Sequence, residues 1–143
     1  MIKRILAPLN DRERSEGIVP AVAAVARDAG SSVRLLRVFP VPDLIVDPRG
    51  HTVAYADQEM ERLTAEGLDD LRRIEARLHG VPVECVVRFG ETAEEIVLEA
   101  EAFEADLIAL TAAKRGRLRA ALRPGIAERV TRRTPVPVLL LHA

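Results

Sequence analysis

The chain has 143 residues, 48% of them hydrophobic, and a formal net charge of −1 at pH 7. This length and hydrophobic content exclude an intrinsically disordered chain and predict one domain spanning residues 1–143, while the small net charge argues against binding to nucleic acid or a membrane surface. With one cysteine, no disulfide can form within the chain, and no apolar run is long enough to span a membrane, so we expect a cytoplasmic protein.

The first part of the chain alternates between strand-like and helix-like patterns. Residues 2–9 form a short apolar run that predicts a strand, and residues 17–29 carry apolar side chains at helical spacing. Gly30 ends this predicted helix, and the nearly continuous apolar run at 32–39 predicts a strand buried on both faces. Residues 40–52 contain three prolines and are too irregular for either element, as in a lid, a partner surface or a mobile loop.

The alternation continues to the end of the chain. The predicted elements are a helix at 54–78, a strand at 82–88, a helix from 90–92 to 103, a strand at 106–111, a helix at 124–133 and a strand at 136–141. Regular alternation of this kind predicts an α/β fold with an open, parallel, five-stranded sheet and helices on both faces. In such sheets, ligands bind at the carboxyl ends of the strands.

A basic loop separates the predicted strand at 106–111 from the helix that Pro124 begins. It contains no acidic residue and five basic ones, Lys114, Arg115, Arg117, Arg119 and Arg123. A strand, a loop and a helix N-terminus in this order can hold an anion, and proline suits the first turn of a helix. The alternative is a solvated basic surface without a ligand.

Five segments of the chain, in matching order and spacing, resemble the universal stress protein family over essentially the full length. They are Lys3–Leu9, Gly90–Ile96, Ala105–Ile108, Ile126–Val130 and Thr134–Leu139. The resemblance implies a Rossmann-like fold with strand order 3-2-1-4-5. It also implies a stress-response or regulatory role, because that is the work of the family.

The resemblance implies ATP binding in many members, through the pattern Gly-x2-Gly-x9-Gly-Ser/Thr. The four defined positions of that pattern fall here on Thr111, Lys114, Pro124 and Gly125, and none keeps the family residue. A family aspartate that helps hold the nucleotide sugar falls on Asn10. Glycine lets the backbone approach phosphate closely, and proline lacks an N–H donor. We therefore expect a degenerate motif and no typical ATP binding.

If a nucleotide or another anion binds, we expect it at the carboxyl edge of the sheet. The candidate residues are Pro8, Leu9, Asn10, Val38, Leu110, Thr111, Lys114, Arg115, Gly116, Gly125 and Ile126. No pairing suggests nucleophilic catalysis, so the only activity we would expect is weak ATP hydrolysis. Cys85 is interpreted as a core residue, and the three scattered histidines do not indicate a metal site.

The last predicted strand is an apolar edge segment preceded by Pro135 and Pro137. Bare apolar edges favour pairing, and family resemblance implies a homodimer joined through this strand. The expected interface residues are Val136, Val138, Leu139, Leu140 and Leu141. Three functions stay open: a regulatory module acting on an unknown protein partner, a weak ATPase that uses the basic loop, and a docking subunit of a larger enzyme or transporter that uses residues 40–55.

Overall fold

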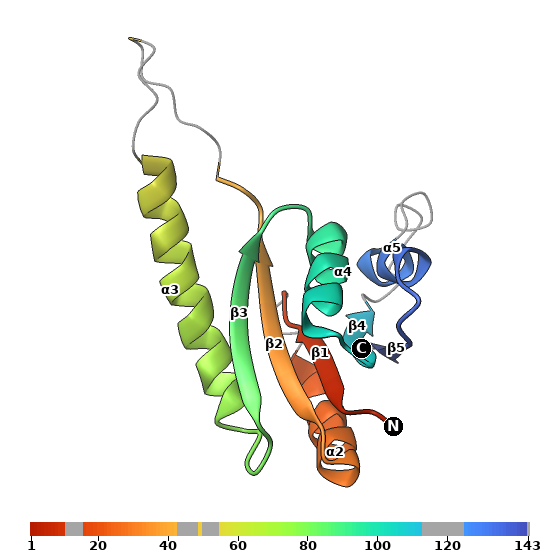
Figure 1. The fold of residues 1–143 in the computed structure, drawn as a ribbon. Helices are drawn as coiled ribbons and strands as arrows, with labels where there is room; N and C mark the ends of the chain where they lie inside the picture. Colours follow the sequence, from red (N-terminus) through yellow and green to blue (C-terminus); the bar gives the residue numbers. More distant parts are fainter. Residues whose placement is uncertain (11–15, 43–48, 50–54, 113–124, 143) are drawn as a thin grey trace.

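The structure, a computed structural model, describes residues 1–10, 16–42, 49, 55–112 and 125–142. Its elements are β1 Arg4–Pro8, η1 Glu16–Ile18, α2 Val19–Ala29, β2 Ser32–Phe39, α3 Tyr55–Glu75, β3 Val83–Phe89, α4 Thr92–Phe103, β4 Leu107–Ala112, α5 Ile126–Arg133 and β5 Val138–His142. The strands form one parallel sheet in the order β3-β2-β1-β4-β5 (Figure 1), which confirms the predicted fold. Among the described residues, no helix has both the length and the apolar composition needed to cross a membrane.

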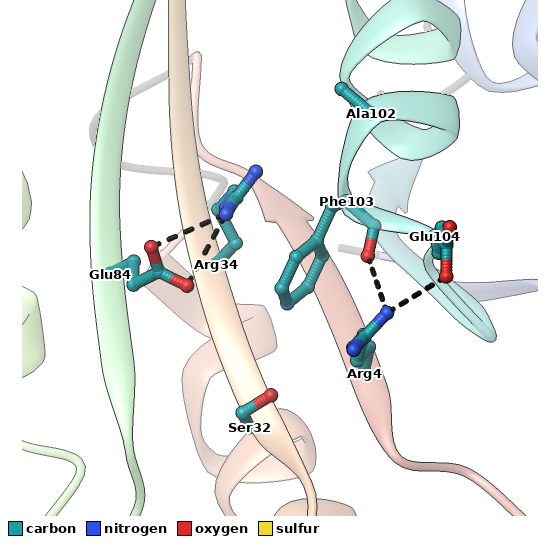
Figure 2. A pocket seen from close by; sticks show the side chains of 7 residues that line it. All are labelled: Arg4, Ser32, Arg34, Glu84, Ala102, Phe103 and Glu104. Atoms are coloured by element: carbon teal, nitrogen blue, oxygen red, sulfur yellow. Dashed lines mark hydrogen bonds and ion pairs between the residues drawn. The ribbon is translucent and has the colours of Figure 1, made fainter.

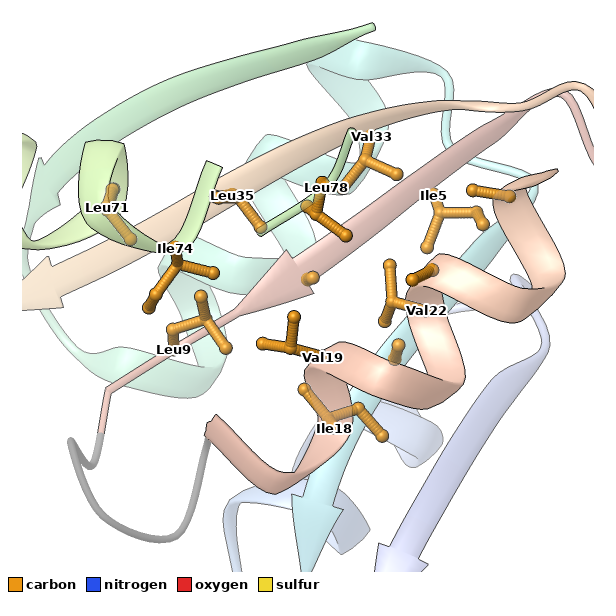
Figure 3. Packing of buried hydrophobic residues seen from close by; sticks show 14 of the residues in the cluster. Ile5, Leu9, Ile18, Val19, Val22, Val33, Leu35, Leu71, Ile74 and Leu78 are labelled. Carbon is orange, nitrogen blue, oxygen red and sulfur yellow. The ribbon is translucent and has the colours of Figure 1, made fainter. Parts of the chain in front are cut away.

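The sheet divides the hydrophobic core into two layers. Ile5 and Ala7 of β1 pack with side chains of α2 and α3, some of which Figure 3 shows, whereas Leu6 packs with α4 and α5 on the opposite face. All three are buried, because β1 lies in the centre of the sheet and is covered on both sides. This double cover explains why the strands appear in the sequence as nearly continuous apolar runs.

Several element boundaries differ from their predicted positions by a few residues. Helix α5 begins at Ile126 instead of Pro124, because Gly125 is its N-cap and has an extended backbone. The last strand begins at Val138 instead of Val136, since the N–H of Val136 donates to the Thr134 hydroxyl at 3.1 Å and Pro137 has no N–H to offer the sheet. The long helix ends at Glu75, and the residues up to Leu78 form tighter turns. Leu78 is nevertheless buried, so its place in the predicted apolar stripe is correct.

Asp106 links the amino ends of the adjacent strands β1 and β4 through hydrogen bonds. Its Oδ2 accepts the backbone N–H groups of Lys3 at 2.9 Å and Arg4 at 3.0 Å, and its own N–H donates to the carbonyl of Arg4. The two accepted hydrogen bonds favour the ionised carboxylate and therefore lower the pKa of Asp106. This cluster fixes the start of β1 against the start of β4.

Ion pairs join α4 to the β2–β3 side of the sheet. Glu99 of α4, only 4% exposed, lies 3.5 Å from Nη1 of Arg34 on β2 and 3.7 Å from Nη1 of Arg88 on β3. Arg88 also donates through Nε to Glu95, one turn earlier in α4, at 3.2 Å. The buried carboxylate of Glu99, shared by Arg34 and Arg88, therefore holds α4 against β2 and β3 at the polar border of the core.

Candidate functional site

The topology brings the predicted ligand residues of three strands to one edge of the sheet. Leu9 and Asn10 follow β1, Val38 lies near the end of β2, and Leu110 and Thr111 lie near the end of β4. Because β1, β2 and β4 are adjacent and parallel, their carboxyl ends meet at this edge. The N–H of Leu9 continues the β1–β2 ladder by donating to the carbonyl of Leu36 at 2.8 Å.

Most apolar side chains of the predicted site belong to the core instead. Leu9 packs in the layer with α2 and α3, whereas Val38 and Leu110 pack in the layer with α4 and α5. All three are buried, as is Pro8. At these positions a ligand could therefore meet only backbone atoms, and side-chain chemistry at the edge depends on the polar residues.

Asn10 uses its amide oxygen within the protein. Its Oδ1 accepts the backbone N–H of Val38 at 2.9 Å, and this donor can be satisfied only by the oxygen of the amide, which fixes the orientation of the group. For a ligand, the amide then has Nδ2 as a donor and the second lone pair of its neutral Oδ1 as an acceptor. An aspartate in the same place would have a second, charged acceptor oxygen to offer.

Thr111 of β4 pairs with Leu141 of β5. Because Thr111 follows Leu110 in the strand, the side chains of Leu110 and Thr111 point to opposite faces of the sheet. Its hydroxyl is buried and has no hydrogen-bond partner among the described residues. A β-branched side chain therefore fills the place where the family pattern has its first glycine. The predicted residues Lys114, Arg115 and Gly116, with the rest of the basic loop and Pro124, lie outside the described residues.

Helix α5 brings Gly125 and Ile126 to the end of this loop. Gly125 is the N-cap residue and provides no side-chain cap, so the first N–H groups of α5 retain the partial positive charge of a helix N-terminus. Helix α5 is held by apolar and ionic contacts: Val130 is fully buried in the core, Ala127 packs against it, and Arg129 forms an ion pair with Glu91.

Glu91 joins the two helices on this side of the sheet. Besides binding Arg129 of α5, its carboxylate accepts the N–H of Glu94 at 2.6 Å and so caps α4. Sequence reasoning missed this contact, although both residues lie in segments that carry the family resemblance. Glu91 before the predicted helix was a signal for the cap of α4. The ion pair of Glu91 with Arg129 of α5 had no such signal, because it depends on the tertiary fold.

In the part of the chain that the structure describes, the other reactive groups do not form a second centre. Burial, and secondarily the charge of Glu75, raises the pKa of Cys85 to about 11, so its thiol is protonated at neutral pH and is a poor nucleophile. Within the described ranges, no three His, Cys, Asp or Glu side chains are grouped so that they could hold a metal ion.

Comparison with known proteins gives one family. The model of the universal stress protein family matches residues 1–142. No curated protein sequence matches the chain. Similar solved structures include hypothetical protein MJ0577, which is 26% identical with a TM-score of 0.80, the match covering 100% of this chain and 97% of that one.

Two more distant structures share the fold. Universal stress protein UspA from Lactobacillus plantarum is 16% identical with a TM-score of 0.74, and the match covers 98% of this chain and 97% of that one. A universal stress protein solved in complex with cAMP is 15% identical with a TM-score of 0.71, with coverage of 99% and 97%.

Proposed function

The chain belongs to the universal stress protein family, and we propose that it is a single-domain regulatory module of the stress response whose nucleotide site is degenerate. On this proposal the protein acts in the cytoplasm through contacts with another protein and does not cycle ATP. The observation that carries the proposal is the state of Asn10, whose one acceptor atom is neutral and already accepts the N–H of Val38, so that it has no second, charged oxygen for a nucleotide sugar.

The remaining changes at the edge act in the same direction. Thr111 puts a half-buried, β-branched side chain where glycine would let the backbone approach a phosphate. Gly125 retains an N–H at the start of α5 but has no hydroxyl to add to it. Each substitution removes a different contact of the family pattern, so a single compensating residue would not restore ATP binding.

The experiment that tests this proposal measures the free energy of unfolding with and without millimolar ATP and Mg²⁺. A ligand present at 100 times its dissociation constant would add about 2.7 kcal/mol. We expect no such gain for the wild-type chain. A gain that Lys114→Ala abolishes, while the control Lys3→Ala at the opposite end of β1 retains it, would show that the site still binds nucleotide.

A weak nucleotide binder with slow ATPase activity is the second candidate. Two features near this edge favour it, because both leave hydrogen-bonding capacity: the start of α5 has no side-chain cap, and the hydroxyl of Thr111 has no partner among the described residues. A universal stress protein of the same fold was solved with cAMP, so other nucleotides and anions belong in the same unfolding experiment. The third candidate, a docking subunit, depends on residues 40–55, most of which lie outside the described residues.

We also propose a homodimer joined through β5. The two edges of the sheet differ in character, since the edge strand β3 carries Glu84 and Arg88 whereas β5 carries Leu139, Leu140 and Leu141 in succession. Charged residues discourage pairing at an edge, and an apolar edge favours it. Val136 precedes the strand and packs against the core, so the proposed pairing begins at Val138.

The dimer proposal predicts that Leu140→Lys produces monomers. Leu140 is 39% exposed on β5, and a lysine there would place a charge in the proposed interface. The matched control is Leu98→Lys on α4, where the leucine is 41% exposed and lies away from β5. Size-exclusion chromatography with light scattering should show dimers for the wild type and the control; a monomeric wild type at micromolar concentration would contradict the proposal.

A further inference from the structure

A polar hollow lies at the amino edge of the sheet, at the opposite end of the strands from the candidate nucleotide site. Its volume is about 490 Å³, and Figure 2 shows its lining. The residues that matter for its chemistry are Arg4, Ser32, Arg34, Glu84, Phe103 and Glu104. They come from the starts of β1, β2 and β3 and from the end of α4.

Strand register explains why these side chains converge. Arg4 pairs with Ser32 between β1 and β2, and Arg34 pairs with Glu84 between β2 and β3. Alternation along each strand then places all four on the sheet face that α4 covers, since Leu6 and Leu36, two residues further on, pack against α4. Two guanidinium groups and a hydroxyl thus share one side of the sheet, an arrangement suited to an oxyanion.

The two arginines lie on either side of Phe103 (Figure 2). The guanidinium carbon of Arg34 is 4.2 Å from the centroid of the ring, and its Nη1 lies 3.5 Å from the buried Glu99. Its Nε is buried and has no hydrogen-bond partner among the described residues. Arg4 makes its contacts in the hollow through Nη1, with the carbonyl of Phe103 at 3.4 Å and Glu104 at 3.1 Å.

The outer carboxylates of the hollow are held weakly. The side chain of Glu84 is 62% exposed where it binds Nη2 of Arg34, and that of Glu104 is 80% exposed where it binds Arg4. The pair of Arg4 and Glu104 is exposed at both partners and contributes little to stability, so Glu104 can turn into solvent at small cost. Glu84 is also free to turn outward, although its partner Arg34 is mostly buried. The hydroxyl of Ser32 makes only a long hydrogen bond, 3.4 Å, to the carbonyl of Lys3.

We propose that this hollow binds a phosphate-class oxyanion, with Arg4, Arg34 and the Ser32 hydroxyl as donors. In the free protein, Glu84 and Glu104 form ion pairs with the guanidinium groups, and the ligand displaces these two carboxylates. A phosphate dianion carries more charge and more acceptor oxygens than a single glutamate at the rim, so it competes with Glu84 and Glu104 for the guanidinium groups. The site is independent of the nucleotide site because it uses none of its residues.

The experiment is a calorimetric titration with inorganic phosphate at constant ionic strength, with succinate in a second series. Arg4→Gln should weaken phosphate binding about tenfold or more, because it removes a charged donor. Glu84→Gln and Glu104→Gln should each strengthen it about two- to fivefold, because they remove a competitor held by an exposed ion pair. Arg34 is retained in all variants, since it also binds Glu99.

Controls separate this site from general charge effects and from the nucleotide site. Lys3→Gln and Glu101→Gln change exposed charges outside the hollow, and Lys114→Ala changes the basic loop; all three should leave phosphate binding unchanged. Equal weakening by Lys3→Gln and Arg4→Gln would overturn the proposal, as would unchanged affinity in Glu104→Gln. Tighter binding of succinate than of phosphate would overturn the phosphate assignment.

Discussion

Glu99→Ala is expected to lower the free energy of unfolding by about 3 kcal/mol, the low end of the cost of removing one partner of a buried ion pair. Glu99 is buried between Arg34 and Arg88, whose side chains are themselves mostly buried. The substitution leaves two guanidinium groups facing each other without the carboxylate that they share. Arg88 retains its ion pair with Glu95 on α4, whereas Arg34 retains Glu84 on β3 and the ring of Phe103.

The measurement is chemical denaturation at neutral pH, with Glu101→Ala as the control. Glu101 lies on the same helix but is exposed, so its removal should change stability by no more than about 0.5 kcal/mol. Equal effects of the two substitutions would mean that the shared ion pairs do not hold α4 to the sheet.

Gly67→Leu is expected to destabilise the protein by at least about 2 kcal/mol, although leucine favours a helix more than glycine does. Gly67 lies in α3 against the ring of Phe39, which stacks with that of Phe89. A Cβ atom there would lie 2.9 Å from Cε2 of Phe39 and 3.0 Å from Cγ2 of Val87. A leucine would therefore force the helix away from β2 and β3, and this loss exceeds the gain of about 1 kcal/mol in helix propensity.

The same denaturation experiment tests this prediction with Ala65→Leu as the control. Ala65 lies in the same helix but is exposed, so a leucine there adds bulk without a clash. We expect the control to stay within about 0.5 kcal/mol of the wild type. A stabilised Gly67→Leu variant would show that α3 does not depend on its close approach to the sheet.

Sequence reasoning predicted the fold because its signals are local and repeated. Buried parallel strands such as 32–39 appear as apolar runs, and glycines such as Gly30 end the helices between them. The order of the strands came from the family resemblance. The start of the last strand was predicted two residues too early, because Pro137 has no N–H to donate to the sheet and the strand begins only at Val138.

The site was predictable only as a location. The carboxyl edge follows from the parallel topology. The sequence does not indicate that Oδ1 of Asn10 accepts the N–H of Val38, or that Leu9 and Leu110 are core side chains. The hollow at the other edge was missed for a related reason. Arg4, Arg34 and Glu104 are far apart in the chain, and only strand register and the end of α4 bring them together.

The position of β1 has a consequence for synthesis on the ribosome. β1 is made before its two neighbours, and it pairs with β2 on one side and with β4, about a hundred residues later, on the other. During translation, Ile5 and Leu6 therefore belong to a strand with one open edge until β4 emerges. The nascent chain is most open to misassembly in that interval, and the bonds of Lys3 and Arg4 to Asp106 are among the last steps that close the sheet.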